Sequence, residues 1–353
     1  MNRYVRIAGL WACLMVPFEG LRAQSTLRSE GARVGFYVGN AAWEAGTRGH
    51  ESGYTNTLKR EFNSVSTRAQ LCLAVCHPGE NRYNFSEADA VFDFAEQNDM
   101  KVWAHCLLST QDNGATLTGW IKGKNRDQLL AILRDHLHTV INRYKSRGLI
   151  LAWSVVNEPC KHGFFQRAIG ADWIAKALQF AHEADPNTPL LLNEYGVERG
   201  PAGDPAKWEQ FYGMVKGFKE QGVPIHAVGF QGYFELDTKM DKVADAMRRF
   251  QELGIKVHLT EVAVRVHARN PASETLQAQG NKFREILSTC LEAPNCELMT
   301  IFGVTDKLHW LVLSGQVEAP VIFDANYNPK PAYVSLLTEL KSHAPKLKWI
   351  PTK

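Results

Sequence analysis

The sequence predicts a single α/β domain folded as a closed (β/α)8 barrel, the TIM-barrel architecture. Short β-branched or apolar runs alternate with stretches of helical period over about 310 residues. The expected strands are almost continuously apolar, as in parallel strands that helices cover on both faces. No linker, charge block or change of composition interrupts residues 30–345. A doubly wound sheet is the alternative, but no GxGxxG turn follows the first expected strand.

The individual elements follow from the same pattern. Strands are expected at residues 34–39, 62–66, 101–108, 151–157, 190–195, 225–234, 255–264 and 299–305. Helices are expected at residues 86–98, 126–146, 170–184, 206–221, 240–253, 274–292 and 331–342. The first of these helices is expected to open at Ser86, with Asp89 three residues further on.

The first 23 residues are predicted to be a signal peptide that is cleaved. Arg3 and Arg6 precede an apolar run at 7–18, and the residues up to Ala23 supply a cleavage site. A membrane anchor is the alternative, but a run of about 12 residues is shorter than the roughly 20 that span a bilayer. We therefore expect a secreted or periplasmic protein, not held in a membrane, whose catalytic barrel domain covers residues 24–345.

The charge balance excludes several kinds of partner. The chain has 40 basic and 37 acidic residues; removing residues 1–23 takes away three Arg and one Glu and leaves a net charge of +1. An excess this small does not suit a nucleic-acid binder or a protein held on a charged surface. No metal, nucleotide or flavin motif occurs, so we expect no cofactor, and we expect a monomer.

Six cysteines remain after the signal peptide, an even number that permits disulfides in an exported protein. Cys290 and Cys296 flank a Pro-Asn turn, so a local disulfide between them is sterically reasonable. A metal cluster is an alternative for the remaining thiols and nearby histidines: Cys72, Cys76, His77, His105, Cys106, Cys160 and His162. Their spacings match no zinc pattern, so structural thiols or disulfides are the better interpretation, and their pairing stays open.

Two glutamates at expected strand ends carry the functional prediction. Glu158 ends the fourth strand in WSVVNEP, and Glu261 ends the seventh in VHLTEV. Strands four and seven face each other across part of the barrel, so both carboxyls can project into one cleft. Retaining hydrolysis of a glycosidic bond needs such a pair about 5–5.5 Å apart, one nucleophile and one acid/base. A solvated loop carboxylate is the alternative for either residue alone, and is a weaker explanation for both together.

Polar residues stand at the other expected strand ends as well. They are Ser66, His105, Asn157, Asn193-Glu194-Tyr195, Gln231-Gly232-Tyr233 and Thr305-Asp306. Because the loops after parallel barrel strands converge, these side chains are expected to surround the two carboxyls. Asn157, directly before Glu158, is suited to hydrogen-bond the 2-hydroxyl of a sugar.

The chain resembles glycoside hydrolase family 10, the endo-β-1,4-xylanases of retaining-glycosidase clan A, over roughly residues 34–340. The resemblance rests on LKREFNSV, YNFSEADAVFDFAEQNDMKVWAH, WSVVNEP, LLLNEY, HAVGFQGYF, VHLTEV and FGVTDKLHW. It implies hydrolysis of β-1,4-xylan, or of a related plant polysaccharide or oligosaccharide, by double displacement. Glu158 would be the acid/base and Glu261 the nucleophile.

The same resemblance implies further roles. His105, Asn157 and Gln231 would hold the sugar on the non-reducing side of the bond, and Trp310 would form a wall of the cleft. The family also commonly has a short cysteine loop before its eighth strand, where Cys290 and Cys296 fall.

The departures mark a divergent member. Arg68-Ala69-Gln70-Leu71-Cys72 stands where the family has Glu-Asn-Glu-Met-Lys, whose Asn and Lys grip the next sugar out. Substitutions at other positions of the cleft are Ser109 for Trp, Ser154 for Asp, Tyr233 for the His that hydrogen-bonds the nucleophile, and Phe302 for Trp. Tyr233 and Phe302 are still expected to bind the substrate. The Tyr233 hydroxyl can donate one hydrogen bond to a carboxylate, as the family His does.

Three functions stay open at this point. The first is a retaining β-glycosidase of the xylanase type with shifted specificity. The second is a clan-A hydrolase for another β-glycan or a small glycoside. The third is a catalytically weak glycan-binding protein, which the replacement of the His beside the nucleophile keeps in consideration.

Overall fold

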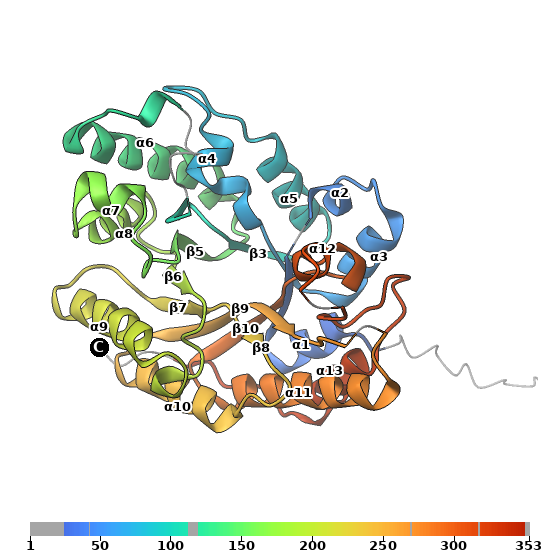
Figure 1. The fold of residues 1–353 in the computed structure, drawn as a ribbon. Coiled ribbons are helices and arrows are strands. Elements are labelled where there is room, and N and C mark those ends of the chain that lie inside the picture. Colours follow the sequence, from blue (N-terminus) through green and yellow to red (C-terminus); the bar gives the residue numbers. More distant parts are fainter. Residues whose placement is uncertain (1–24, 42, 112–118, 269, 317, 350–353) are drawn as a thin grey trace, which may run out of the picture.

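The computed structural model describes residues 25–349 except 42, 112–118, 269 and 317 (Figure 1). The predicted signal peptide at 1–23 lies outside the described residues. Eight parallel strands form the centre: β1 (Tyr37–Ala41), β2 (Ser64–Ser66), β3 (Lys101–Ala104), β5 (Ile150–Asn157), β6 (Leu190–Glu194), β7 (Ala227–Phe230), β9 (Lys256–Val264) and β10 (Cys296–Ile301). They pair in chain order, and β10 pairs with both β9 and β1, which closes the barrel. The predicted fold class is confirmed.

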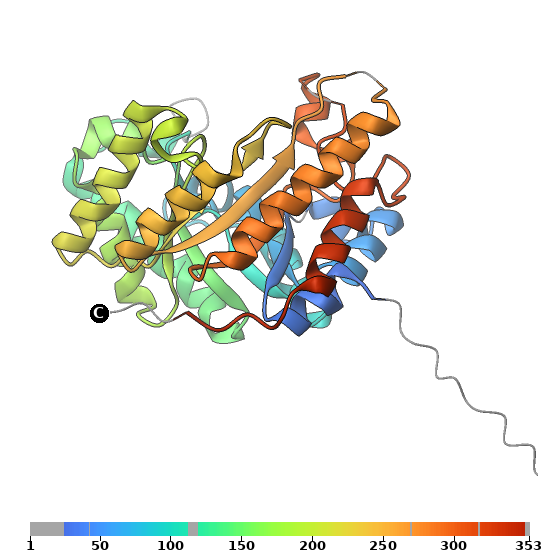
Figure 2. The same cartoon turned by 90° about the horizontal axis from the view of Figure 1, so that it is seen from below.

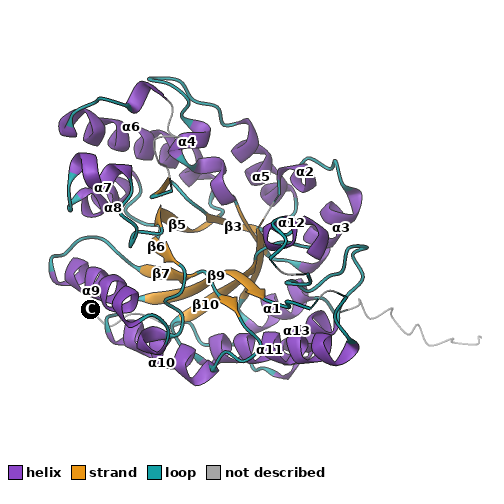
Figure 3. Ribbon diagram, viewed as in Figure 1, coloured by secondary structure: helices purple, strands orange, loops and turns teal. Residues whose placement is uncertain are grey.

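Helices surround this barrel on the outside (Figure 3). They are α1 (Leu27–Val34), α2 (Glu44–Thr47), α3 (Ser52–Glu61), α4 (Leu73–Cys76), α5 (Ser86–Gln97), α6 (Arg126–Tyr144), α7 (Phe164–Ile169), α8 (Trp173–Ala184), α9 (Pro205–Glu220), α10 (Met240–Glu252), α11 (Ser273–Glu292), α12 (Trp310–Leu313) and α13 (Pro331–Ser342). In Figure 2, the orange α11 and the red α13 lie side by side along the barrel wall.

Alternation along the strands decides which side chains reach the barrel interior. Five fully buried residues from neighbouring strands form a cluster of their own, apart from the larger core: Trp103, Ala152, Leu191, Ala227 and Leu298. Side chains two residues further along a strand point to the same side. His105 and Asn193 therefore follow Trp103 and Leu191 toward the carboxyl end of the barrel, where the interior becomes polar.

Several expected strand bounds were wrong. The first strand begins at Tyr37 rather than at residue 34, because α1 continues to Val34 and ends at Gly35 in a left-handed conformation (φ 71°). The expected strands at 101–108 and 225–234 are interrupted, and β4 (Leu108–Ser109) and β8 (Tyr233–Phe234) are separate short strands. Helix α5 begins at Ser86 as expected, and the preceding residue Phe85 makes no side-chain cap.

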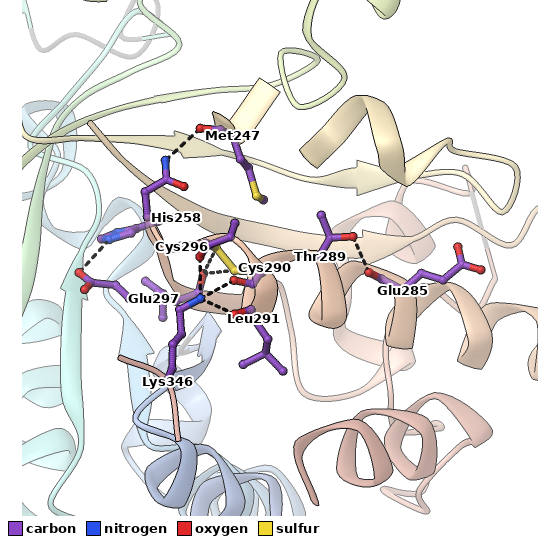
Figure 4. The surroundings of a disulfide bond; sticks show 12 residues. Met247, His258, Glu285, Thr289, Cys290, Leu291, Cys296, Glu297 and Lys346 are labelled. Atoms are coloured by element: carbon purple, nitrogen blue, oxygen red, sulfur yellow. Dashed lines mark hydrogen bonds and ion pairs between the residues drawn. A yellow bond between two sulfur atoms is a disulfide. The ribbon is translucent and has the colours of Figure 1, made fainter. Parts of the chain in front are cut away.

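Cys290 and Cys296 form a close pair at the amino end of β10, away from the carboxyl ends of the strands (Figure 4). Their Cα atoms are 5.3 Å apart, within the range that a disulfide needs. Beside them the Lys346 ammonium donates to the carbonyl oxygens of Cys290, Leu291 and Ala293, the last of these at 2.6 Å. The C-terminal segment thus satisfies carbonyls that the end of α11 leaves without helical partners.

Candidate active site

A cavity of about 1020 Å³ opens at the carboxyl ends of the strands. All predicted catalytic and substrate-binding residues line it: His105, Asn157, Glu158, Gln231, Tyr233, Glu261, Phe302 and Trp310. They come from β9, from the end of β5 and from the segments that follow β3, β5, β7 and β10. The structure therefore brings together in one cleft residues that lie about 200 positions apart in the sequence.

Asn193, at the end of β6, ties the two halves of the cleft together. Its Nδ2 donates to Asn157 Oδ1 at 2.9 Å and to Glu261 Oε1 at 2.8 Å, while its Oδ1 accepts from the Thr260 hydroxyl at 2.6 Å. Asn193 is fully buried, so each of these bonds is sheltered from water. The network fixes the orientation of Glu261 relative to the strand that carries Asn157.

Gly229 on β7 makes room for this network. A Cβ at that position would lie 2.2 Å from Asn193 Oδ1 and 2.9 Å from the Thr260 side chain. Both neighbouring side chains are held in place by buried hydrogen bonds. The glycine in HAVGFQGYF is therefore required by close approach of Asn193 to the backbone.

Glu261 lies within β9 rather than at its end. The strand continues to Val264 because Ala263 and Val264 pair with β8, so the expected position of Glu261 as the last residue was wrong. Burial raises the pKa of the Glu261 carboxyl to about 7, and the hydrogen bonds from Tyr233 and Asn193 oppose that rise. The nearby charge of Glu158 raises the pKa further, whereas that of Arg68 lowers it.

Glu158 follows β5 directly, in a left-handed backbone conformation (φ 57°) although it precedes Pro159. Its amide donates to the Asn193 carbonyl at 2.7 Å, and its own carbonyl accepts from the Thr110 hydroxyl at 2.7 Å. Such strained conformations persist only where surrounding contacts impose them, and they occur often at functional sites. The backbone contacts hold the carboxyl of Glu158 at the edge of the cleft.

The carboxylate of Glu158 is contacted from two sides. Gln111 Nε2 donates to Glu158 Oε1 at 2.9 Å, and Gln231 Nε2 lies 3.4 Å from both that oxygen and Asn157 Oδ1. Lys161 forms an ion pair with the other oxygen. Glu158 therefore has a cationic neighbour, whereas the groups that hydrogen-bond Glu261 are neutral.

His105 faces the cleft as a neutral ring. Burial lowers the pKa of its imidazole to about 3, with the charge of Arg68 acting in the same direction. Nδ1 lies 3.1 Å from the Ser154 hydroxyl, and Nε2 lies 3.8 Å from Glu261 Oε1. If Ser154 donates to Nδ1, the Nε2 hydrogen points to the cleft, where a sugar hydroxyl can accept it.

Tyr233 lies beside Glu261, as the sequence predicted. Its hydroxyl donates to Glu261 Oε2 at 2.8 Å and accepts from Trp310 Nε1 at 3.0 Å. Trp310 is 38% exposed and meets the Tyr233 ring edge to face at 5.7 Å. An aromatic surface thus continues from the carboxylate to solvent, as expected for a wall on which a sugar stacks.

The match to known proteins agrees with this geometry. The sequence profile described as glycosyl hydrolase family 10 matches residues 26–339. The chain belongs to this family. Its relatives include endo-1,4-beta-xylanase B of Thermotoga neapolitana, 34% identical over 86% of this chain and 87% of the relative. A beta-1,4-xylanase of Dictyoglomus thermophilum is 35% identical over 79% of this chain and 82% of the relative.

Solved structures give the same result. Native xylanase 10B from Thermotoga maritima superimposes with a TM-score of 0.82 at 31% identity, covering 90% of this chain and 98% of that chain. The predictions of family, barrel fold and enzyme class are therefore confirmed: this family 10 chain is a glycoside hydrolase.

Sequence reasoning placed some strand-end residues in the cleft wrongly. Glu194 is fully buried, pairs with Lys207 at 2.8 Å and accepts from the Cys160 amide, so it supports the wall from behind. Asp306 pairs with Lys330 at 3.0 Å, and neither Thr305 nor Ser66 lines the cavity. Ser66 and Glu194 do end β2 and β6, whereas β10 ends at Ile301 and Thr305 and Asp306 lie beyond it. The direction of each side chain depends on contacts between distant segments.

The lining residues missed as functional candidates include Arg68, Gln111 and Lys161. Each follows a strand end by two to four residues, and that position was the one available signal. Ala69, Cys72 and Ser109, singled out as departures from the family, also line the cavity. The rewritten positions therefore belong to the cleft itself.

The cysteine–histidine set does not gather into one cluster. Among residues 25–349 as far as they are described, no group of three or more His, Cys, Asp or Glu side chains is arranged to hold a metal ion. The Sγ atoms of Cys72 and Cys106 lie 2.7 Å apart in the wall of the cleft. None of the described helices is long and apolar enough to cross a membrane.

Proposed function

We propose that this protein is an endo-1,4-β-xylanase that hydrolyses β-1,4-xylan with retention of configuration. The observation that carries the proposal is the pair of buried carboxyls, Glu158 and Glu261, that project from β5 and β9 into one open cleft. The relatives described above are xylanases by name and match most of this chain, which supports xylan as the substrate.

The geometry supports distinct roles for the two carboxyls. Glu261 is held by neutral donors in a fixed orientation, which suits a nucleophile that must attack the anomeric carbon along one line. Glu158 lies beside the half-exposed Lys161 at the edge of the cleft, where protons can be exchanged with the leaving group and with water.

Double displacement then runs in two steps. Glu261 attacks the anomeric carbon while the Glu158 carboxyl protonates the departing glycosidic oxygen, which leaves a glycosyl ester on Glu261. Glu158, now a carboxylate, takes a proton from water as that water attacks the anomeric carbon and releases Glu261. Asn157, whose Oδ1 accepts from Asn193, would hydrogen-bond the 2-hydroxyl of the sugar.

Two measurements test this proposal. A 2,4-dinitrophenyl 2-deoxy-2-fluoro-β-xylobioside should inactivate the enzyme and leave a glycosyl adduct on the peptide that contains Glu261. Linear β-1,4-xylan should yield short xylo-oligosaccharides faster than mixed-linkage β-glucan yields products. Absence of both an adduct and any turnover would favour a glycan-binding protein, and faster attack on β-glucan would favour the other clan-A hydrolase.

We also propose that residues 1–23 direct export and are removed, giving a monomeric secreted or periplasmic enzyme. The basic, apolar and small-residue order at the N-terminus supports this proposal. N-terminal sequencing of protein recovered outside the cytoplasm should begin at Gln24, and light scattering should give the mass of one chain. Recovery of full-length protein in the membrane fraction would contradict cleavage.

A further inference from the structure

Two arginines of the cleft, Arg68 and Arg199, form no ion pair among the described residues, and of the two only Arg68 is partly buried. Lys161 forms an ion pair with Glu158, and Arg265 Nη1 lies 3.0 Å from Glu235 Oε1. Within the described part of the chain, the Arg68 side chain forms no ion pair, although it lines the same cavity as the two catalytic carboxyls. A guanidinium stays charged at every pH at which the protein is folded, so its charge in the cleft is permanent.

The backbone holds Arg68 in a conformation that few residues adopt. Strand β2 ends at Ser66, and Arg68 follows with a left-handed φ of 50°. Its amide donates to the Ser66 hydroxyl at 3.2 Å, and the Thr67 hydroxyl donates to the His105 carbonyl at 2.7 Å. These bonds tie the segment to the neighbouring strand, and the guanidinium carbon lies 5.3 Å from the centre of the Phe302 ring.

Space and chemistry beside Arg68 suit an anionic group on a ligand. Ala69, Cys72, Ala74 and Val75 line the same cavity, and none of them carries a charge or a long polar side chain. Among the described residues no carboxylate forms an ion pair with the guanidinium, which leaves its N–H donors for a ligand. A guanidinium presents a planar fork of N–H donors that matches the two oxygens of a carboxylate.

We propose that Arg68 is a binding site for the carboxylate of an acidic sugar, so that the enzyme acts preferentially on xylan that carries uronic acid residues. The proposal rests on the proposed xylanase function and names the substrate class within it. The competing explanation is that Arg68 serves only as a counter-charge for Glu261, whose carboxylate its charge stabilises.

The decisive substrates differ only in the carboxylate. One is glucuronic-acid-substituted β-1,4-xylan, and the other is the same material after its carboxyl groups have been reduced to alcohols. The wild-type protein should show kcat/KM at least about tenfold higher on the acidic form, the size expected for a charge-assisted hydrogen bond. Arg68→Gln should remove this preference, and Arg68→Lys should keep part of it, since a point charge remains without the planar fork.

Controls separate the site from general effects. Arg134→Gln removes an arginine that pairs with Glu183 outside the cleft, so it should keep the wild-type preference and the wild-type rate on 4-nitrophenyl β-xylobioside. Arg68→Gln should lower kcat/KM on the acidic xylan at least about tenfold more than on this neutral substrate, because any effect of the lost charge on Glu261 acts on both substrates alike. Binding of oligosaccharides from the acidic and the reduced xylan is measured in parallel by titration calorimetry on the Glu261→Ala background, which does not depend on turnover.

The outcomes are distinct. Equal wild-type rates and affinities for the acidic and the reduced xylan would overturn the carboxylate site. A loss of kcat/KM in Arg68→Gln that is equal on neutral and acidic substrates would also overturn it, and would mean that Arg68 acts by stabilising the charge of Glu261. Carboxylate-dependent binding that Arg68→Gln removes, in a protein that hydrolyses no xylan, supports the site and overturns the proposed function instead.

Discussion

Removing the Tyr233 hydroxyl tests how the cleft controls the charge of Glu261. In Tyr233→Phe the ring and its edge-to-face contact with Trp310 remain, but the 2.8 Å hydrogen bond to Glu261 Oε2 and the bond from Trp310 Nε1 are lost. Asn193 is then the remaining donor to this carboxylate among the contacts described above. Because the lost bond favours the ionised form, the pKa of Glu261 must rise in the variant.

The size of the rise follows from the bond. A hydrogen bond to a charged group contributes about 1.5–3 kcal/mol, and 1.36 kcal/mol corresponds to one pH unit in a pKa. We therefore expect the pKa to rise by about one to two pH units from the value of about 7 that burial gives Glu261. A nucleophile must be ionised, so at pH 6 the variant should lose roughly ten- to a hundredfold in kcat/KM.

The assay is the pH profile of kcat/KM on 4-nitrophenyl β-xylobioside between pH 4 and 9. Its acidic limb reports the ionisation of the free enzyme, and the difference between variant and wild type should shrink as the pH increases. Tyr83→Phe is the matched control, because its hydroxyl donates to Asp135 at the same 2.8 Å but lies outside the cleft. An acidic limb that stays in place in Tyr233→Phe, or moves to lower pH, would refute the reasoning.

Three further outcomes are expected. Glu261→Ala should lower kcat by several orders of magnitude without rescue to a β-azide, whereas azide should partly rescue Glu158→Ala on substrates with good leaving groups; a reversed pattern exchanges the two roles. Peptide mapping without reductant should show the Cys290–Cys296 disulfide in protein from an oxidising compartment, and free alkylation of both would contradict it. Lengthening an aryl xyloside to the xylobioside should raise kcat/KM less than about tenfold, because Ala69 and Cys72 offer that sugar no charged donor. Ala69→Asn with Cys72→Lys should restore the dependence, and a wild-type gain of a hundredfold or more would contradict the lost subsite.

The barrel could be predicted because its signal is local. Each strand is an apolar run bounded by polar residues, and this pattern placed all eight strands of the barrel to within a few residues. The errors arose where pairing overrides local pattern. Val34 was expected to start a strand but closes α1, and the expected strand at 225–234 is interrupted after Phe230, so that Tyr233 and Phe234 pair separately with β9. Neither feature is encoded within the segment it affects.

Some residues of the candidate site could likewise be predicted from local sequence, and others could not. Residues at strand ends, such as Asn157 and Gln231, could be predicted, since a barrel brings all such positions to one face. Arg68 could not be predicted as a cleft cation, because its direction depends on a left-handed backbone held by hydrogen bonds to the neighbouring strand. The burial that sets the pKa of Glu261 likewise comes from elements distant in the sequence.

The carboxyls lie on or directly after barrel strands, whereas the changed sugar contacts around Arg68 lie in a loop, which explains how this family 10 chain can keep the one while the other changes. Glu261 and Asn193 lie on strands whose register is fixed by ladder hydrogen bonds and by the close approach at Gly229. A substitution there would disturb the barrel as well as the reaction. Arg68 and its neighbours lie beyond the end of β2, where a side chain can be exchanged with little effect on strand pairing. Substitutions in the loops can therefore change specificity as long as the two carboxyls keep their positions. The Arg68 variants test a loop position, and the Tyr233 variant tests the surroundings of a carboxyl.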